Sequence, residues 1–456
     1  MRSPCACEEF RFVEKRWAKM FSRKTFRLVA LLMVAALMFG AVGSITHAQT
    51  VQLRILWYND GNEGEVYRAA LDRFEAENPG IKVTLDVVGF SDLHNILQAN
   101  IEAGTPPDMG SITQLGRFQG RYLDLRPFLA DPEAFEANYP ESFLNWLRVP
   151  GGEDKGIYGF PRSVGVSGPF VNVTLFEQAG IPLPEGDKVT WAEWIDLATK
   201  VAKATNTPYA VAIDRSGHRT FGPMMSYGAQ ILDPATGRFT VDSPGFRAFA
   251  TEMKRWHDEG LTPPEVWIGG GGAYRAAKEY FVNGELVFYY SGSWQVSAFT
   301  REIGDNFEWR AVPQPCGETG ICGGMPGGTA LVAFAGTKHP QEVAKVMEYL
   351  ASTEVNIQTS ANSLFLTGNL KAIEQGVPYP ASKEQFDVFL SNIPKLTEQG
   401  WRLQGHPFID IINVETRDQL GRYFAGEISL DEAIQRLQAK VDEACDKEPN
   451  KCVPWK

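Results

Sequence analysis

The 456-residue chain has 44% hydrophobic and 22% charged residues, a composition typical of soluble globular proteins and not of disordered chains. Its length exceeds what one ordinary hydrophobic core accommodates and predicts two or more domains. The formal net charge of −11 argues against nucleic acid or an anionic membrane surface as a partner.

The chain begins with a segment typical of a cleaved signal peptide, residues 1–48. Lys and Arg residues precede an apolar run at 28–44, and small residues after it suit cleavage behind Ala48. Met20 is a second candidate for the start. No second apolar run of that length follows, which favours export to the periplasm or the cell exterior over a membrane span. Because no cysteine comes directly after the run, the sequence does not predict a lipid anchor. Cleavage would remove eight Lys or Arg and three Glu and change the net charge from −11 to −16.

Strand and helix patterns alternate at the start of the mature chain. Residues 51–60 alternate in hydrophobicity as a strand does, and residues 63–80 carry apolar side chains at helical spacing. A second strand pattern at 81–90 and a second helix pattern at 91–104 follow. This β-α-β-α order predicts an α/β fold with a mainly parallel sheet covered by helices on both faces.

The same kinds of segment return later in the chain. Residues 190–205 have a helix pattern that opens with Thr190 and Glu193 in the positions of a capping box. The other predicted elements are strands at 209–213 and 286–290 and helices at 339–352 and 429–444.

Four cysteines remain after removal of the signal peptide, and they form two closely spaced pairs. The pairs are Cys316 with Cys322 and Cys445 with Cys452. In an oxidising compartment this spacing predicts two local disulfides. A zinc site is the alternative, although no histidine lies near these cysteines in the sequence and their spacings differ from those of zinc motifs.

No motif marks the chain as an enzyme or predicts a cofactor. The sequence lacks H-E-x-x-H, the G-x-S-x-G nucleophile elbow and a lysine-containing phosphate loop. With 55 acidic residues, two carboxylates could still meet in space as they do in a glycoside hydrolase. An exported glycosidase therefore stays open as an alternative.

Aromatic and polar residues cluster where three predicted strands end. The clusters are residues 57–60, 215–221 and 293–295. Open parallel sheets bind ligands at the carboxyl ends of their strands, and aromatic faces beside Asn, Asp, Arg and Gln suit sugar rings. Composition alone leaves Trp294 either a core residue or a ligand contact, and its position after a strand favours the contact.

Six segments of the chain, taken together and in this order, resemble the motifs of a known protein family. They are FEAENPGIKVTLDVV at 74–88, IEAGTPPDMGSI at 101–112, GIYGFPRSVGVSGPFVNVTLFEQAGI at 156–181, TWAEW at 190–194, YFVNGELVFYYSGSW at 280–294 and HPQEVAKVMEYLASTEVN at 339–356. Together they resemble family one of the extracellular solute-binding proteins of bacterial ABC importers, in its carbohydrate-binding, maltose-binding-protein-like branch.

The resemblance implies a two-lobed, type II-like periplasmic-binding-protein fold, with three crossings between lobes that close on a ligand. Lobe one would comprise residues 49–164 plus 330–375, and lobe two residues 165–328 plus 380–456. The implied protein is a monomer that captures a sugar or oligosaccharide without catalysis and delivers it to ABC permease subunits. A sugar acid, a sugar phosphate or another non-carbohydrate solute is the alternative ligand.

The resemblance also implies a set of ligand contacts in the cleft between the lobes. Arg162 and Arg219 are the members that would suit an anionic ligand. For Trp401, packing between helices is the alternative role. The residues implied as contacts are Trp57, Tyr58, Asn59, Asp60, Thr113, Gln114, Arg162, His218, Arg219, Trp294, Gln295, Trp401 and Arg402.

Overall fold

The computed structural model describes residues 50–269 and 273–454. Val51–Lys456 form one compact unit. The signal peptide predicted at residues 1–48 lies outside the described residues. Within the described ranges, no helix is both long enough and apolar enough to cross a membrane.

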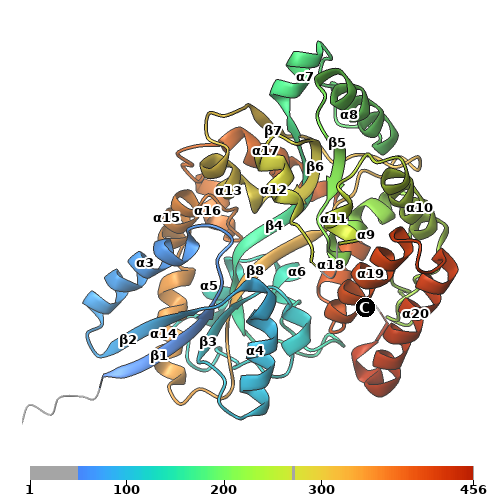
Figure 1. The fold of residues 1–456 in the computed structure, drawn as a ribbon. Helices are drawn as coiled ribbons and strands as arrows, with labels where there is room; N and C mark the ends of the chain where they lie inside the picture. The colour runs from blue at the N-terminus through green and yellow to red at the C-terminus, as the bar shows by residue number, and fades with distance from the viewer. Residues whose placement is uncertain (1–49, 270–272, 455–456) are drawn as a thin grey trace, which may run out of the picture. The chain divides into compact units, whose positions relative to one another are not determined.

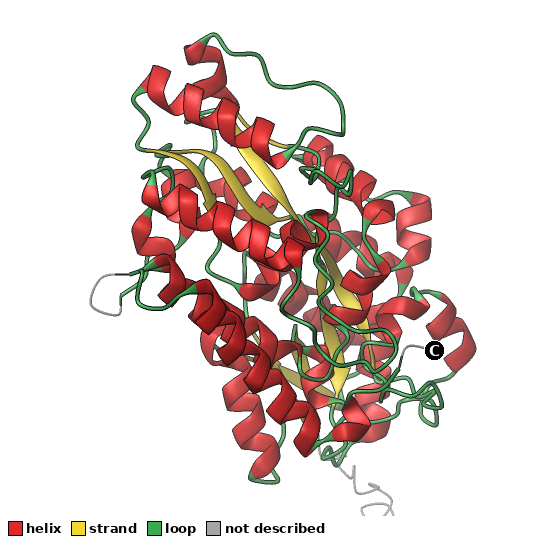
Figure 2. Cartoon of the chain, turned by 90° about the vertical axis from the view of Figure 1, so that its right-hand side faces the viewer, coloured by secondary structure: helices red, strands yellow, loops and turns green. Residues whose placement is uncertain are grey.

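The described strands form one mixed sheet with helices on both sides (Figure 1, Figure 2). The strands are β1 (Val51–Trp57), β2 (Ile81–Val87), β3 (Met109–Ile112), β4 (Gly159–Asn172), β5 (Tyr209–Ile213), β6 (Leu286–Gly292), β7 (Trp309–Ala311) and β8 (Pro326–Ala333). Their order in the sheet is β2-β1-β3-β8-β4-β6-β5, and β7 pairs separately with β4.

Two long strands connect the halves of this sheet. Parallel pairs join β1 to β2 and to β3 in one half, and β5 to β6 in the other. β4 and β8 pair antiparallel with each other from Gly159↔Val332 to Val166↔Pro326. β8 also pairs with β3, and β4 pairs with β6. β4 and β8 therefore run from the β1–β3 half to the β5–β6 half.

Helices cover both halves of the sheet. Those before β6 are α3 (Glu63–Glu77), α4 (Phe90–Glu102), η1 (Leu115–Phe118), α5 (Pro132–Ala137), α6 (Glu141–Leu144), α7 (Val173–Ala179), α8 (Trp191–Thr205), α9 (Gly217–Ser226), α10 (Pro244–Asp258), α11 (Pro264–Trp267) and α12 (Ala277–Val282). Those after β6 are α13 (Gln295–Glu302), α14 (Pro340–Ala351), α15 (Thr353–Ser363), α16 (Leu370–Gln375), α17 (Lys383–Asn392), η2 (Ile393–Lys395), α18 (Glu398–Gln404), α19 (Ile409–Phe424), α20 (Leu430–Lys447) and η3 (Pro449–Lys451).

The β1–β3 half is buried on both faces, because side chains along a strand alternate between faces. Leu53, Ile55 and Trp57 of β1 pack on one face, whereas Leu56 and Tyr58 pack on the other. We call these two layers together the N-terminal core. It also includes Ile112, Leu115, Phe118, Leu331 and Val332.

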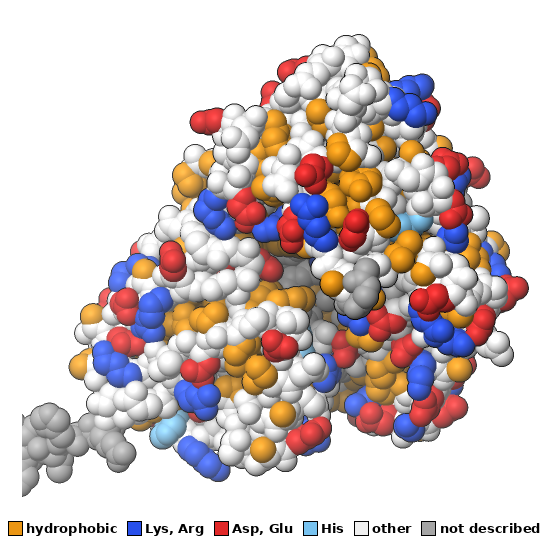
Figure 3. Space-filling view, in the orientation of Figure 1, with side chains coloured by type: hydrophobic (Ala, Val, Ile, Leu, Met, Phe, Trp, Pro, Cys, Tyr) orange, Lys and Arg blue, Asp and Glu red, His pale blue; other side chains and the backbone are white. Residues whose placement is uncertain are grey.

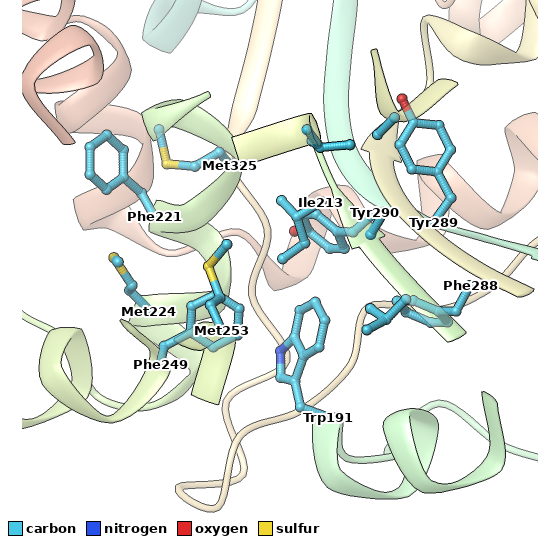
Figure 4. Close-up of a cluster of buried hydrophobic side chains, with 14 of the residues drawn as sticks. Trp191, Ile213, Phe221, Met224, Phe249, Met253, Phe288, Tyr289, Tyr290 and Met325 are labelled. Carbon is cyan, nitrogen blue, oxygen red and sulfur yellow. The ribbon is translucent and has the colours of Figure 1, made fainter. Parts of the chain in front are cut away.

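A second core, the C-terminal core, surrounds β5 and β6 (Figure 4). Trp191, at the start of α8, packs against Phe249, Phe288 and Tyr290 with ring centroids 5.3, 6.1 and 5.2 Å away. The capping box predicted for α8 is present, with hydrogen bonds in both directions between Thr190 and Glu193. Other members of this core are Val166, Trp194, Ile213, Phe221, Ile409 and Ile412.

The four cysteines of the predicted mature chain are paired as disulfides, as predicted. Cys316 bonds to Cys322, and Cys445 bonds to Cys452. These pairings leave no thiolate for the zinc alternative. Elsewhere in residues 50–269 and 273–454, no group of three or more His, Cys, Asp or Glu side chains is arranged to hold a metal ion.

Candidate functional site

The carboxyl ends of neighbouring parallel strands bring distant loops together. Leu56 of β1 pairs with Gly110 of β3, and Ile213 of β5 pairs with Tyr290 of β6. The segments that follow these four strands line one cavity of about 620 Å³, which we call the cleft. Figure 3 shows this side of the molecule hollowed near its centre, with acidic and basic side chains around the hollow.

Residues of both cores and of the connecting strands contribute to the cleft. Seven of the residues implied as ligand contacts line it, and all seven follow the carboxyl end of a strand. These seven are Tyr58, Asp60, Thr113, Gln114, His218, Arg219 and Trp294. The other six, Trp57, Asn59, Arg162, Gln295, Trp401 and Arg402, do not line it. Ligand contact remains a prediction for the whole set.

Trp57 and Asn59 support the loop between β1 and α3. Trp57 is fully buried in the N-terminal core. Its indole Nε1 donates to Asn59 Oδ1 at 2.9 Å, and the same oxygen accepts the backbone N–H of Gly64 at 2.9 Å. The Asn59 amide therefore ties the first turn of α3 to the end of β1.

Arg162 is a buried cation on β4, away from the cleft lining. Its Nε donates to Ser111 Oγ at 3.1 Å, and its Nη2 lies 4.0 Å from the Glu63 carboxylate. Its guanidinium also lies over the Trp57 ring, 4.6 Å from the centroid. Because Glu63 is fully buried as well, the two charges balance each other inside the protein.

Gln295 supports a carboxylate instead of lining the cleft. Its Nε2 donates to Tyr289 Oη and to Ser291 Oγ, both at 3.3 Å. These hydroxyls in turn donate to the two oxygens of Asp214, at 2.5 and 2.6 Å. Asp214 lines the cleft, and its Oδ2 lies 3.5 Å from Arg219 Nε.

His218 is held as a neutral ring beside Arg219. Burial, and next the charge of Arg219, lower the pKa of His218 to about 3. Its Nδ1 lies 2.6 Å from Arg219 Nη1, which can only donate, so Nδ1 accepts. Its Nε2 therefore carries the proton and donates to Pro326 O at 3.1 Å and Gln404 Oε1 at 3.0 Å.

Trp294 stands between the end of β6 and the start of α13, with its indole partly exposed in the cleft. The Arg219 guanidinium lies over the ring, with Cζ 3.9 Å from the centroid. The benzo end of the indole packs on the backbone of Gly165 and Gly292. A Cβ at Gly292 would come within 2.0 Å of Trp294 Cη2, so only glycine fits there.

Asp60 is an accessible carboxylate on the N-terminal side of the cleft. The surrounding protein desolvates it, and the negative charge of Glu63 lies nearby. Both effects raise the pKa of Asp60 to about 6, against the opposing influence of Arg162, Arg219 and Lys278.

Trp401 and Arg402 lie at a second cavity of about 730 Å³. Trp401 stacks on Trp146, with ring centroids 5.4 Å apart, and its carbonyl accepts the indole N–H of Trp146 at 2.9 Å. Arg402 forms an ion pair with Glu398 at 3.6 Å. This geometry corresponds to the helix-packing alternative for Trp401.

One face of α19 supplies cleft residues that the sequence did not reveal. Asp410, Asn413 and Arg417 line the cleft from positions three and four residues apart, which share a helix face. Asp410 accepts hydrogen bonds from Gln114 Nε2 at 2.5 Å and from Arg117 Nη1 at 3.0 Å. The polar spacing along residues 409–417 was the available signal, but polar helix faces usually face solvent.

The family model and the similar known proteins all describe binding proteins. The family model described as "Bacterial extracellular solute-binding protein" matches residues 59–357. A binding protein of Brucella abortus (strain 2308) is 26% identical over 370 residues, which cover 79% of this chain and 86% of that protein. The multiple sugar-binding protein of Streptococcus mutans serotype c is 24% identical over 347 residues, covering 72% of this chain and 79% of that protein.

The solved structures agree in fold. The GacH receptor of Streptomyces glaucescens, solved unliganded and with acarbose, superposes with a TM-score of 0.72 at 20% identity, covering 87% of this chain and 98% of that one. The two-lobed α/β fold implied by the resemblance is thereby confirmed. Because the family model spans well over half of the sequence, the chain belongs to the bacterial extracellular solute-binding protein family.

Proposed function

We propose that this protein captures a sugar or oligosaccharide in the cleft and delivers it to the permease subunits of an ABC importer. The observation that carries the proposal is the cleft itself, where Asp60, Asp214 and Arg219 offer acceptors and a donor around the indole of Trp294. Sugar hydroxyls both donate and accept hydrogen bonds, and this mixture suits them. The relative in Streptococcus mutans that is named a multiple sugar-binding protein supports the same ligand class.

In this proposal the two cores correspond broadly to the two closing lobes, with lobe one at residues 49–164 plus 330–375 and lobe two at 165–328 plus 380–456. Leu364 and Leu366 are exceptions, since they lie in lobe one but pack in the C-terminal core. The first two crossings would lie near Ser163–Ser167 and Met325–Thr329, and the bridging strands β4 and β8 contain these segments almost entirely. A ligand in contact with both lobes favours the closed form.

The proposal includes export, with cleavage after Ala48, and action as a monomer that binds without catalysis. The family is one of binding proteins. N-terminal sequencing of the secreted protein tests the cleavage site, and gel filtration with light scattering tests the monomer. Turnover of oligosaccharides by the purified protein would overturn the absence of catalysis.

A thermal-shift screen of the mature chain tests the ligand class. The panel contains neutral mono-, di- and trisaccharides, their uronic acids and phosphates, and polyamines. We expect the largest rise in melting temperature from a neutral sugar, with titration calorimetry giving a one-to-one complex. A rise only with polyamines or other non-carbohydrates would refute the proposed function.

A further inference from the structure

The indole of Trp294 is not an open platform in this structure. Its benzo end rests on the backbone of Gly165 and Gly292, and the Arg219 guanidinium lies over the ring at 3.9 Å from the centroid. A sugar that stacked on the covered face would first have to displace Arg219. Planar guanidinium groups stack well on indole, and this contact stabilises a desolvated cation.

Arg219 is held by more than the indole. Its Nη1 donates to His218 Nδ1 at 2.6 Å, and Nε lies 3.5 Å from Asp214. The Nε atom is buried and has no hydrogen-bond partner within the described residues. The side chain nevertheless keeps 18% of its surface exposed, and this surface lies in the cleft.

The groups that hold Arg219 are themselves fixed. Tyr289 and Ser291 hold Asp214, while Pro326 and Gln404 hold His218. A side chain bounded by an indole, a fixed carboxylate and a fixed imidazole has little rotamer freedom left to lose on binding. Arg219 is therefore preorganised as a donor.

We propose that Arg219 is the ligand-contacting residue at this end of the cleft, that Trp294 acts through it as a positioning residue, and that the ligand is a neutral carbohydrate. The inference rests on the proposed function and refines it. A neutral ligand suits the charges nearest Arg219: Asp214 lies on one side and Asp60 across the cleft, so an acidic group at this end would meet carboxylates as well as the guanidinium. Three further arginines, Arg215, Arg275 and Arg417, line other parts of the cleft, so the uronic acid comparison below is the deciding test.

A double-mutant cycle on the mature chain tests this, with the neutral sugar that gives the largest thermal shift as the probe. The variants are Arg219→Met, Trp294→Ala and the double variant. We expect each single change to weaken binding about tenfold or more, and the double variant to bind no more weakly than Arg219→Met alone. Arg219→Lys keeps the positive charge but loses the planar guanidinium, and it should bind the sugar with intermediate affinity. This variant replaces Arg219→Met in the cycle if Arg219→Met does not fold.

Matched controls separate this role from stability. Arg255→Met removes an arginine from α10, and Trp309→Ala removes a partly buried tryptophan from β7. Neither residue lines the cleft, so affinity should stay unchanged even where the melting temperature falls. The uronic acid counterpart of the probe should bind wild type at least tenfold more weakly.

The outcomes are distinguishable. If Trp294 itself stacks on the sugar, Arg219→Met will leave affinity unchanged or raise it, and Trp294→Ala will add its full effect in that background; either result overturns the positioning role. Tighter binding of the uronic acid overturns the neutral ligand class. In all these cases a sugar still binds and the proposed function survives, whereas failure of every sugar to bind wild type overturns both.

Discussion

Replacing Asp410 by Ala should weaken sugar binding, because its carboxylate joins the two cores across the cleft. Asp410 lies on α19, beside Ile409 of the C-terminal core. Its partners Gln114 and Arg117 flank Leu115 of the N-terminal core. A contact that joins the cores contributes to ligand affinity to the extent that it is lost when they separate.

The expected size follows from the burial of the pair. The Asp410 and Arg117 side chains are each 22% exposed. The ion pair between them is therefore intermediate between two classes. Exposed ion pairs contribute roughly 0.2–1 kcal/mol, and breaking a buried pair costs about 3–5 kcal/mol. Burial raises the pKa of Asp410 although Arg117 opposes it, so desolvation offsets much of the attraction. We expect a loss of about 1 kcal/mol, which is roughly a fivefold increase in Kd.

Titration calorimetry with the sugar identified by the thermal-shift screen measures this loss. Arg117→Ala and the double variant complete a cycle that should be clearly non-additive. Glu415→Ala is the matched control, since Glu415 lies on the same helix but bonds only to Gln419 among the contacts found for it. Wild-type affinity in Asp410→Ala, or additive effects of the two single changes, would refute the role of this contact in closure.

Three further predictions concern the cleft, the loop after β3 that lines it, and the Cys445–Cys452 disulfide. Sugar affinity should fall as the pH drops from 7 to 5, because the pKa of Asp60 is raised to about 6 and protonation removes its charge as an acceptor. Asp60→Asn should reduce this change, and calorimetry at several pH values measures it. His94→Phe should lower the free energy of unfolding by about 2 kcal/mol in urea titrations, because His94 Nε2 accepts the backbone N–H groups of Thr113 and Gln114. Replacing both Cys445 and Cys452 by Ser should cost about 2 kcal/mol of the same quantity, as expected for a short closed loop, while the unreduced wild-type mature chain should show no free thiol.

Local sequence patterns correctly predicted those features that depend only on one strand or one helix. The alternation along β1 and the apolar face of α8 led directly to the observed strand and helix. Trp294 was placed at the end of a strand because Ser291, Gly292 and Ser293 interrupt an apolar run, and β6 does end at Gly292.

The same alternation could have separated Trp57 from Tyr58. Trp57 follows Leu53 and Ile55 on one face of β1, whereas Tyr58 falls on the other face and reaches the cleft. Treating residues 57–60 as one cluster hid this difference.

Contacts between segments that are distant in the chain could not be predicted from the sequence. No local signal pairs Gln114 with Asp410 or places Arg219 over Trp294. These pairs arise from strand register and from the way α19 crosses the cleft, which depend on the packing of the whole unit. For the same reason, the cation of Arg162 could not be assigned to Glu63 in advance.

The pairing of β4 with β8 limits how the two cores can move relative to each other. Two hydrogen-bonded strands resist sliding and stretching, but as a ribbon they twist at small cost. Gly165 faces Gly327 and Val164 faces Gly328 in this ribbon, so three of these four positions carry no side chain of their own. We therefore expect twisting and bending of this ribbon, and not sliding of the strands, to carry any relative motion of the two cores.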